Sequence, residues 1–199
     1  MKTLLVTQVI KNGLLGVLLL LSSFVHADSP TKIDSLADRL GTARDFTVLD
    51  GNFTQTKHLA QMPMALKSAG QFRFEKAGQL TWEVTSPVTS RLLIYADKIV
   101  QYDGDRPVMT LTAEQQPVVR VLGDIFYGIL LSDPQRLARQ FTLVADDNLD
   151  VTRLVPTDRV LGLAIDWIEL SGEGQVSAFR MQEHNGDQLF IELQELRYR

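Results

Sequence analysis

Along most of the chain, apolar and polar residues alternate with a period of two, in short runs separated by turn residues. Such runs, with turn signals roughly every 8–12 residues, are typical of antiparallel strands. The turns contain Gly, Asn, Asp or Pro, and Asn185-Gly186 is the strongest hairpin signal. The pattern predicts about ten or eleven strands. The runs lie at 53–57, 71–74, 80–85, 91–95, 99–102, 141–144, 149–155, 160–170, 175–182 and 188–196.

Other segments carry apolar residues at helical spacing. Ser29-Pro30 is a helix start that precedes such a run up to Leu40, and Gly41 ends it. A wider apolar stripe predicts a helix over 118–130, and Asp133-Pro134 predicts the start of a short second helix. These helices interrupt the series of strands. We therefore expect one mainly β domain with helices (α+β).

About ten antiparallel strands in one domain tend to curl into a barrel or half-barrel, and the concave face must then be filled. The apolar helix at 118–130 is the natural filler, because Arg120 and Asp124 are its only charged residues. Two interpretations stay open. The helix is either a fixed plug of the core or a removable lid over an apolar cavity.

The N-terminus has the organisation of a secretory signal peptide. Lys2 and Lys11 precede an apolar run at 14–21, which is too short to span a bilayer, and Val25-His26-Ala27 places small residues at a cleavage site. We expect export to the periplasm, with cleavage after Ala27, and a single domain over 28–199. The alternative is an N-terminal membrane anchor.

Composition and charge exclude several classes of function. The 199 residues include 20 Lys+Arg, 24 Asp+Glu and no Cys, so disulfide frameworks, zinc fingers and thiol nucleophiles are excluded. Removal of the leader takes away two Lys, and the remaining charge is (20 − 2) − 24 = −6. An acidic chain lacks the clustered positive charge that nucleic-acid binding needs. We therefore expect no nucleic-acid partner.

Catalytic and metal-binding signals are weak. Only His58 and His184 remain after the leader, and no Gly-x-Ser-x-Gly motif accompanies them. The 146–157 segment has acidic and amide residues at the first positions of a calcium loop, but Val151 and Thr157 replace the required Gly and Glu. We expect neither an enzyme nor a metal site.

Several motifs in the first half of the chain occur in a characteristic order. The segment Leu49-Asp50-Gly51-Asn52-Phe53-Thr54-Gln55 is followed by Gly70-Gln71-Phe72-Arg73-Phe74, Leu80-Thr81-Trp82, Ser86-Pro87 and an apolar run ending at Asp97. This series resembles the outer-membrane lipoprotein carrier (LolA-like) family over residues 36–105. In that family, the turn between the second and third strands usually contains an Arg that holds the helical lid shut. Lys76 stands at that place here. The chain is identified as a divergent member.

The resemblance implies a strongly curved half-barrel covered by helices, with an apolar cavity that takes acyl chains. The residues that it assigns to the cavity are Phe53, Phe72, Phe74, Leu80, Trp82, Leu93 and Tyr95. The residues that it assigns to the lid are Val118, Leu122, Ile125, Phe126 and Ile129, with Lys76 as the group that holds the lid.

The function implied by the resemblance is transport without covalent chemistry and without a cofactor. A periplasmic carrier would bind the acyl chains of a lipoprotein or lipid and ferry this cargo between membranes. Its partners would be an inner-membrane transporter or exporter and an outer-membrane acceptor, and we expect a monomer. A second interpretation keeps the half-barrel without transport: a periplasmic interaction or sensor domain that binds a protein or lipid-linked partner.

Overall fold

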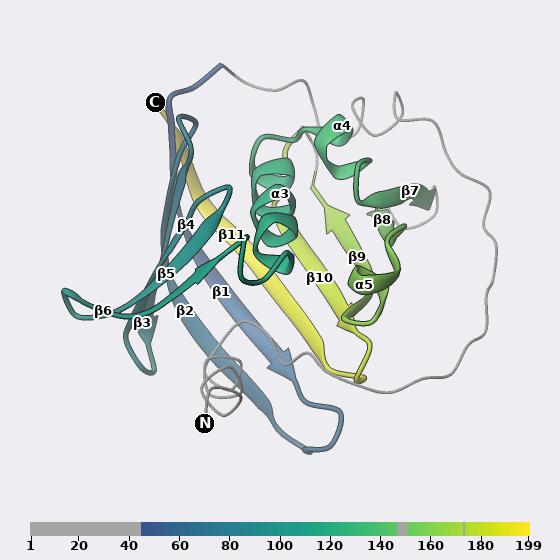
Figure 1. The fold of residues 1–199 in the computed structure, drawn as a ribbon, viewed down its shortest axis with the longest axis horizontal. Helices are drawn as coiled ribbons and strands as arrows, with labels where there is room; N and C mark the ends of the chain where they lie inside the picture. The colour runs from purple at the N-terminus through teal and green to yellow at the C-terminus, as the bar shows by residue number, and fades with distance from the viewer. Residues whose placement is uncertain (1–44, 147–150, 173) are drawn as a thin grey trace.

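The computed structural model describes residues 45–146, 151–172 and 174–199, and the strands form one antiparallel, eleven-stranded sheet (Figure 1). The sheet curves and does not close. This confirms the expectation of a mainly β half-barrel with helices. The expected leader at 1–27 and the expected helix after Ser29 lie outside the described residues.

The two halves of the chain build the two halves of the sheet. The order across the sheet is β6-β5-β4-β3-β2-β1-β11-β10-β9-β8-β7. The first half contains β1 (Val48–His58), β2 (Ala65–Glu75), β3 (Gln79–Ser86), β4 (Ser90–Ile94), β5 (Lys98–Asp103) and β6 (Arg106–Thr112). The second half contains β7 (Phe141–Asp146), β8 (Val151–Pro156), β9 (Ile165–Ser171), β10 (Ala178–Glu183) and β11 (Gln188–Tyr198). The central pairing of β1 with β11 joins the two halves.

The helices lie where the topology requires a crossing. The strands β6 and β7 are at opposite edges of the sheet, so the chain between them must pass across one face. This connection contains α3 (Val118–Leu130) and α4 (Pro134–Leu137), and α3 lies in front of the concave face (Figure 1). A third helix, α5 (Arg159–Gly162), lies between β8 and β9.

The core lies between the concave face and α3. Inward-facing residues of the strands and the buried side of α3 form one hydrophobic cluster, which includes Phe74, Leu80, Ile94 and Val119, each essentially inaccessible to solvent. Within the described ranges, no helix has the length and apolar character needed to cross a bilayer.

Two parts of the sheet differ from the pattern prediction. The prediction of a continuous strand over 160–170 is wrong, because the first residues of this range belong to α5 and β9 begins only at Ile165. The side chain of Asp158 caps α5 by accepting from the N–H groups of Val160 and Leu161. The edge strand β6 is additional. Its residues are mostly exposed. Pro107 fits an edge strand, because β6 has a neighbouring strand on one side only and proline lacks the N–H that a second neighbour would need.

Candidate functional site

Four aromatic side chains on the inward faces of β1, β2 and β3 form an aromatic floor beneath α3. They are Phe53, Phe72, Phe74 and Trp82. The Trp82 ring stacks on Phe53 at 3.8 Å between centroids and 19° between planes, and it lies 5.8 Å from Phe72. Each of the four side chains is at most 2% exposed, and Leu80 beside them is fully buried. The sequence-predicted residues Phe53, Phe72, Phe74, Leu80 and Trp82 are therefore brought together.

Glycines opposite two of the aromatic rings make this arrangement possible. In the β1–β2 register, Phe72 pairs with Gly51 and Phe53 pairs with Gly70. A Cβ on Gly51 would lie 2.8 Å from the Phe72 ring, and a Cβ on Gly70 would lie 2.7 Å from the Phe53 ring and 2.0 Å from the Glu83 carbonyl oxygen. Each phenyl ring thus occupies the space that a side chain on the neighbouring strand would need.

The α3 helix covers this floor through apolar contacts. Phe126 lies 5.9 Å from Trp82, and Tyr127 meets Phe74 edge-on at 5.0 Å. Ile125, Phe126 and Ile129 are buried, whereas the predicted lid residues Val118 and Leu122 are half-buried. The helix has no side-chain N-cap hydrogen bond, no acid in its first turn and no base in its last turn. Its stability therefore depends on tertiary packing.

Two polar atoms are buried in the contact between helix and floor. The Trp82 Nε1 and the Tyr127 hydroxyl have no hydrogen-bond partner among the described residues. The Tyr127 hydroxyl lies beside the β2–β3 turn, 3.9 Å from the position of a Cβ on Gly78. Burial raises the pKa of Tyr127, and the nearby Arg136 partly offsets this effect. Buried polar groups are nearly always paired, so two unpaired polar atoms in one contact are an exception to that rule.

A cation from α4 provides a polar tie to α3. The Arg136 guanidinium lies 3.6 Å from the Asp124 carboxylate and 5.4 Å from the centre of the Tyr127 ring. Asp133 caps α4 by accepting from the Arg136 N–H at 3.0 Å. Sequence reasoning did not identify Arg136 or Tyr127 as site residues, because their roles depend on the packing of α4 against α3.

Two predicted site residues, Leu93 and Lys76, lie away from the floor, and a third, Tyr95, lies beside α3. Leu93 pairs with Thr81 and so faces the side of the sheet opposite to Trp82 and Ile94. Tyr95 follows β4, and its backbone carbonyl oxygen lies against α3, 3.1 Å from the position of a Cβ on Gly123; Lys98 Nζ lies 4.7 Å from the Tyr95 ring centre. The ammonium of Lys76 lies 3.5 Å from Asp45 and 5.8 Å from the Phe46 ring, so its contacts hold the segment before β1 rather than α3.

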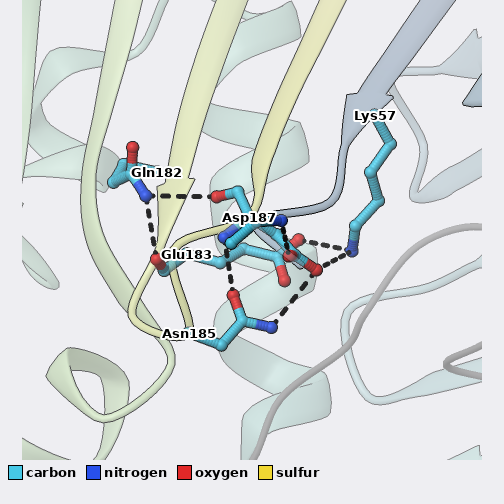
Figure 2. A network of polar contacts seen from close by, with 6 residues as sticks. Lys57, Gln182, Glu183, Asn185 and Asp187 are labelled. Carbon is cyan, nitrogen blue, oxygen red and sulfur yellow. Dashed lines mark hydrogen bonds and ion pairs between the residues drawn. The ribbon is translucent and has the colours of Figure 1, made fainter. Parts of the chain in front are cut away.

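A buried polar cluster lies at one end of the concave face, beside the β10–β11 turn (Figure 2). Its members are Lys57, Glu183 and Asp187. The Lys57 ammonium is 2.8 Å from Glu183 Oε1 and 3.6 Å from Asp187 Oδ2, and Glu183 is 1% exposed. Asn185 donates to Asp187, whose backbone N–H bonds back to the Asn185 side-chain oxygen. The cluster thus fixes the turn against the end of β1.

The cluster predicts a pH-dependent stability. Burial raises the pKa of Glu183 above its ordinary value of 4.5, and Lys57 only partly offsets this rise. The Glu183 carboxyl therefore holds its proton more tightly in the folded than in the unfolded protein. Its contribution to the free energy of unfolding is complete below pH 4.5 and is lost as the pH rises through the pKa of the folded state. Urea unfolding at stepped pH should show the wild-type protein losing stability relative to Glu183→Gln across that window. A pH-independent difference would contradict this, and the exposed Glu192→Gln is the matched control.

Comparisons with solved structures show low similarity. A LolA superfamily protein from Nitrosomonas europaea is 12% identical, with 84% of this chain and 92% of that chain covered at a TM-score of 0.47. A putative outer membrane lipoprotein-sorting protein domain from Vibrio parahaemolyticus is 11% identical, with 76% of this chain and 85% of that chain covered at a TM-score of 0.44. The MucA/MucB complex structure from Pseudomonas aeruginosa gives 14% identity, with 75% of this chain and 51% of that chain covered at a TM-score of 0.37. No curated protein sequence matches the chain.

The family comparison covers the whole described fold. The family model described as outer membrane lipoprotein carrier protein LolA matches residues 44–199. This range includes every strand of the half-barrel, the aromatic floor and the α3 helix that covers it. The chain belongs to the LolA family of outer membrane lipoprotein carrier proteins.

Proposed function

We propose that this protein is a periplasmic carrier that binds acyl chains of a lipoprotein or lipid against the aromatic floor after α3 moves away. The observation that carries the proposal is the contact between α3 and the floor. Phe126 lies against Trp82 and Tyr127 against Phe74, while two buried polar atoms lack partners among the described residues. The family match supports a carrier rather than an enzyme.

The energetics of acyl-chain burial suit this exchange. Each CH₂ group removed from water contributes about 0.8 kcal/mol, so one long acyl chain supplies on the order of 10 kcal/mol. Part of this free energy is spent on displacing α3, because helix and ligand compete for the same apolar surface. The apparent affinity for the acyl chain is then the intrinsic affinity of the open form multiplied by the fraction of molecules that are open. Such competition gives a carrier that binds cargo and can also release it.

The contacts of α3 favour a lid over a fixed plug. A plug that evolved as core would be expected to satisfy its buried polar groups, because an unpaired buried donor costs about 1–3 kcal/mol. Movement of α3 would expose Trp82 Nε1 and the Tyr127 hydroxyl to water or to polar groups of the cargo. The ion pair of Arg136 with Asp124 and its stacking on Tyr127 would keep α3 attached to α4.

The leader expected at 1–27 and the family match together support action in the periplasm. The carrier would take its cargo from an inner-membrane transporter or exporter and deliver it to an outer-membrane acceptor. The mature domain, 28–199, would act as a monomer.

The two tryptophans of the chain allow a direct test of acyl-chain binding. In Trp167→Phe, Trp82 in the floor is the only tryptophan, and in Trp82→Phe the only tryptophan is Trp167, half-buried beneath Arg153. Each delipidated variant is titrated with a brominated fatty acid, whose bromine quenches fluorescence on contact. The proposal predicts saturable quenching of Trp82 and none of Trp167. Absence of saturable Trp82 quenching would contradict carriage and favour a domain that binds a protein partner.

A further inference from the structure

The turn between β1 and β2 exposes an unusual group of apolar side chains. Met62, Met64 and Leu66 are 47%, 58% and 47% exposed, and no acidic residue occurs between His58 and Lys67. We call residues 59–66 the hairpin tip. The β1–β2 hairpin extends past the neighbouring β10–β11 turn at this end of the sheet (Figure 1). Apolar side chains at a projecting tip, with Met among them, are suited to an apolar partner.

Positive charge lies on the outer face of the sheet just behind this tip. The register places Lys67 opposite Thr56, Thr56 opposite Phe190, and Phe190 opposite Arg180, so the four residues form one row across β2, β1, β11 and β10. The row crosses a hollow of about 520 Å³ whose lining contains Lys67, Arg180 and His58 and no carboxylate. Arg180 also lies 4.0 Å from Glu169 on the far side of the row. Lys67 makes no ion pair with any described residue.

The buried polar cluster holds the base of the hairpin tip. The Ala60 N–H donates to Asp187 Oδ1 at 2.9 Å, and a Cβ on Gly186 would lie 3.0 Å from the Ala60 side chain. Asp187 in turn contacts Lys57 at the end of β1 (Figure 2). The tip is thereby fixed in direction, so that little ordering is needed when it meets a partner.

We propose that the hairpin tip docks onto the surface of an anionic phospholipid bilayer. Met62 and Met64 enter the boundary between head groups and acyl chains, and Leu66, Lys67 and Arg180 lie nearer the level of the phosphates. Lys67 is three residues from Met64, which lies just before β2, so the chain can separate the two by up to about 10 Å. Interfacial elements bury their apolar residues about 5–10 Å deep, so this spacing matches the distance between the two layers.

Charge complementarity favours the bilayer over an apolar protein surface. The chain as a whole has a formal charge of −4, so an anionic surface would repel most of the molecule and attract it only at this end. One orientation is therefore selected. Apolar insertion and attraction of basic residues to anionic head groups act together at such a surface. This docking does not depend on the proposed carriage of acyl chains.

The test is flotation of the purified protein with vesicles of phosphatidylethanolamine and phosphatidylglycerol, compared with vesicles of phosphatidylcholine. Binding to the anionic vesicles is expected to be stronger and to weaken as NaCl is raised. Lys67→Gln should weaken it about fivefold, because one basic residue near the surface contributes that factor. The double variant Met62→Gln with Met64→Gln should weaken it on the order of tenfold.

Matched variants elsewhere control for general surface effects. Val108→Thr with Val155→Thr removes exposed apolar surface from β6 and β8, and Lys98→Gln removes an exposed Lys from β5. All changes are at exposed positions, so each protein should remain folded, as checked by circular dichroism. Equal binding to the two vesicle types would overturn the proposal. So would equal weakening by the control variants, or binding of the tip to an acidic peptide without binding to vesicles.

Discussion

Replacement of Trp82 with alanine should lower the free energy of unfolding by about 3–5 kcal/mol, the range typical of a buried Trp. Trp82 is 2% exposed and contacts Phe53 and Phe72 in the sheet and Phe126 in α3, so its loss opens a space that neither layer alone can fill. The stacked pair with Phe53 is also lost, which adds to the effect of lost burial.

Urea unfolding followed by far-UV circular dichroism measures this effect. Trp167→Ala is the matched control, because Trp167 is half-buried and its ring contacts the Arg153 guanidinium. We expect the control to cost about 1–2 kcal/mol. Equal costs for the two variants would show that the aromatic floor is not the centre of the core.

Gly70→Ala should destabilise the protein by about 3 kcal/mol, at the upper end of the usual cost of overpacking. The added methyl group would lie 2.0 Å from the Glu83 carbonyl oxygen and 2.7 Å from the Phe53 ring. The carbonyl belongs to the paired strand β3 and cannot move away as a flexible side chain could. Either the β2–β3 pairing or the Phe53 ring must therefore shift.

Gly162→Ala is the same chemical change without the crowding. A Cβ on Gly162 has no atom within 4 Å, and the residue is the last of α5, so alanine should leave stability unchanged or raise it by up to about 1 kcal/mol. Thermal and urea unfolding of both variants measure the contrast. A small loss at Gly70, similar to the change at Gly162, would contradict the close approach of Phe53 to β2.

Sequence patterns predicted the parts of this fold that depend on local periodicity. The stripe from Val118 to Ile129 predicted α3, because a helix that covers an apolar sheet must carry apolar residues at helical spacing. Alternation in β3 predicted that Leu80 and Trp82 share a face. The paired motifs Gly51-x-Phe53 and Gly70-x-Phe72 also had a readable physical meaning, since each Phe lies over the other strand's Gly.

Features set by long-range packing were not readable from the sequence. Leu93 lies in a nearly continuous apolar strand, where alternation does not show which face is inward; the register with Thr81 decides it. Arg136 reaches Tyr127 only because α4 folds back on α3. The ion pair of Lys57 with Glu183 joins residues 126 positions apart, and its burial depends on the curvature of the sheet.

A disulfide between α3 and the β4–β5 turn tests most directly whether α3 is a lid. The natural chain has no cysteine, so Ala96→Cys with Gly123→Cys introduces one unique pair. A Cβ on Gly123 lies 3.4 Å from the Ala96 Cα, which is close enough for a disulfide. The Gly123→Cys variant alone controls for crowding against the Tyr95 carbonyl oxygen, which is 3.1 Å from that Cβ.

The decisive measurement is binding of an environment-sensitive fatty-acid probe to this double variant, before and after reduction with dithiothreitol. A lid predicts that the oxidised protein loses saturable binding and that reduction restores it to the level of the single variant. Equally tight binding by the oxidised and reduced forms would contradict the account, because the floor would then be reached without movement of α3.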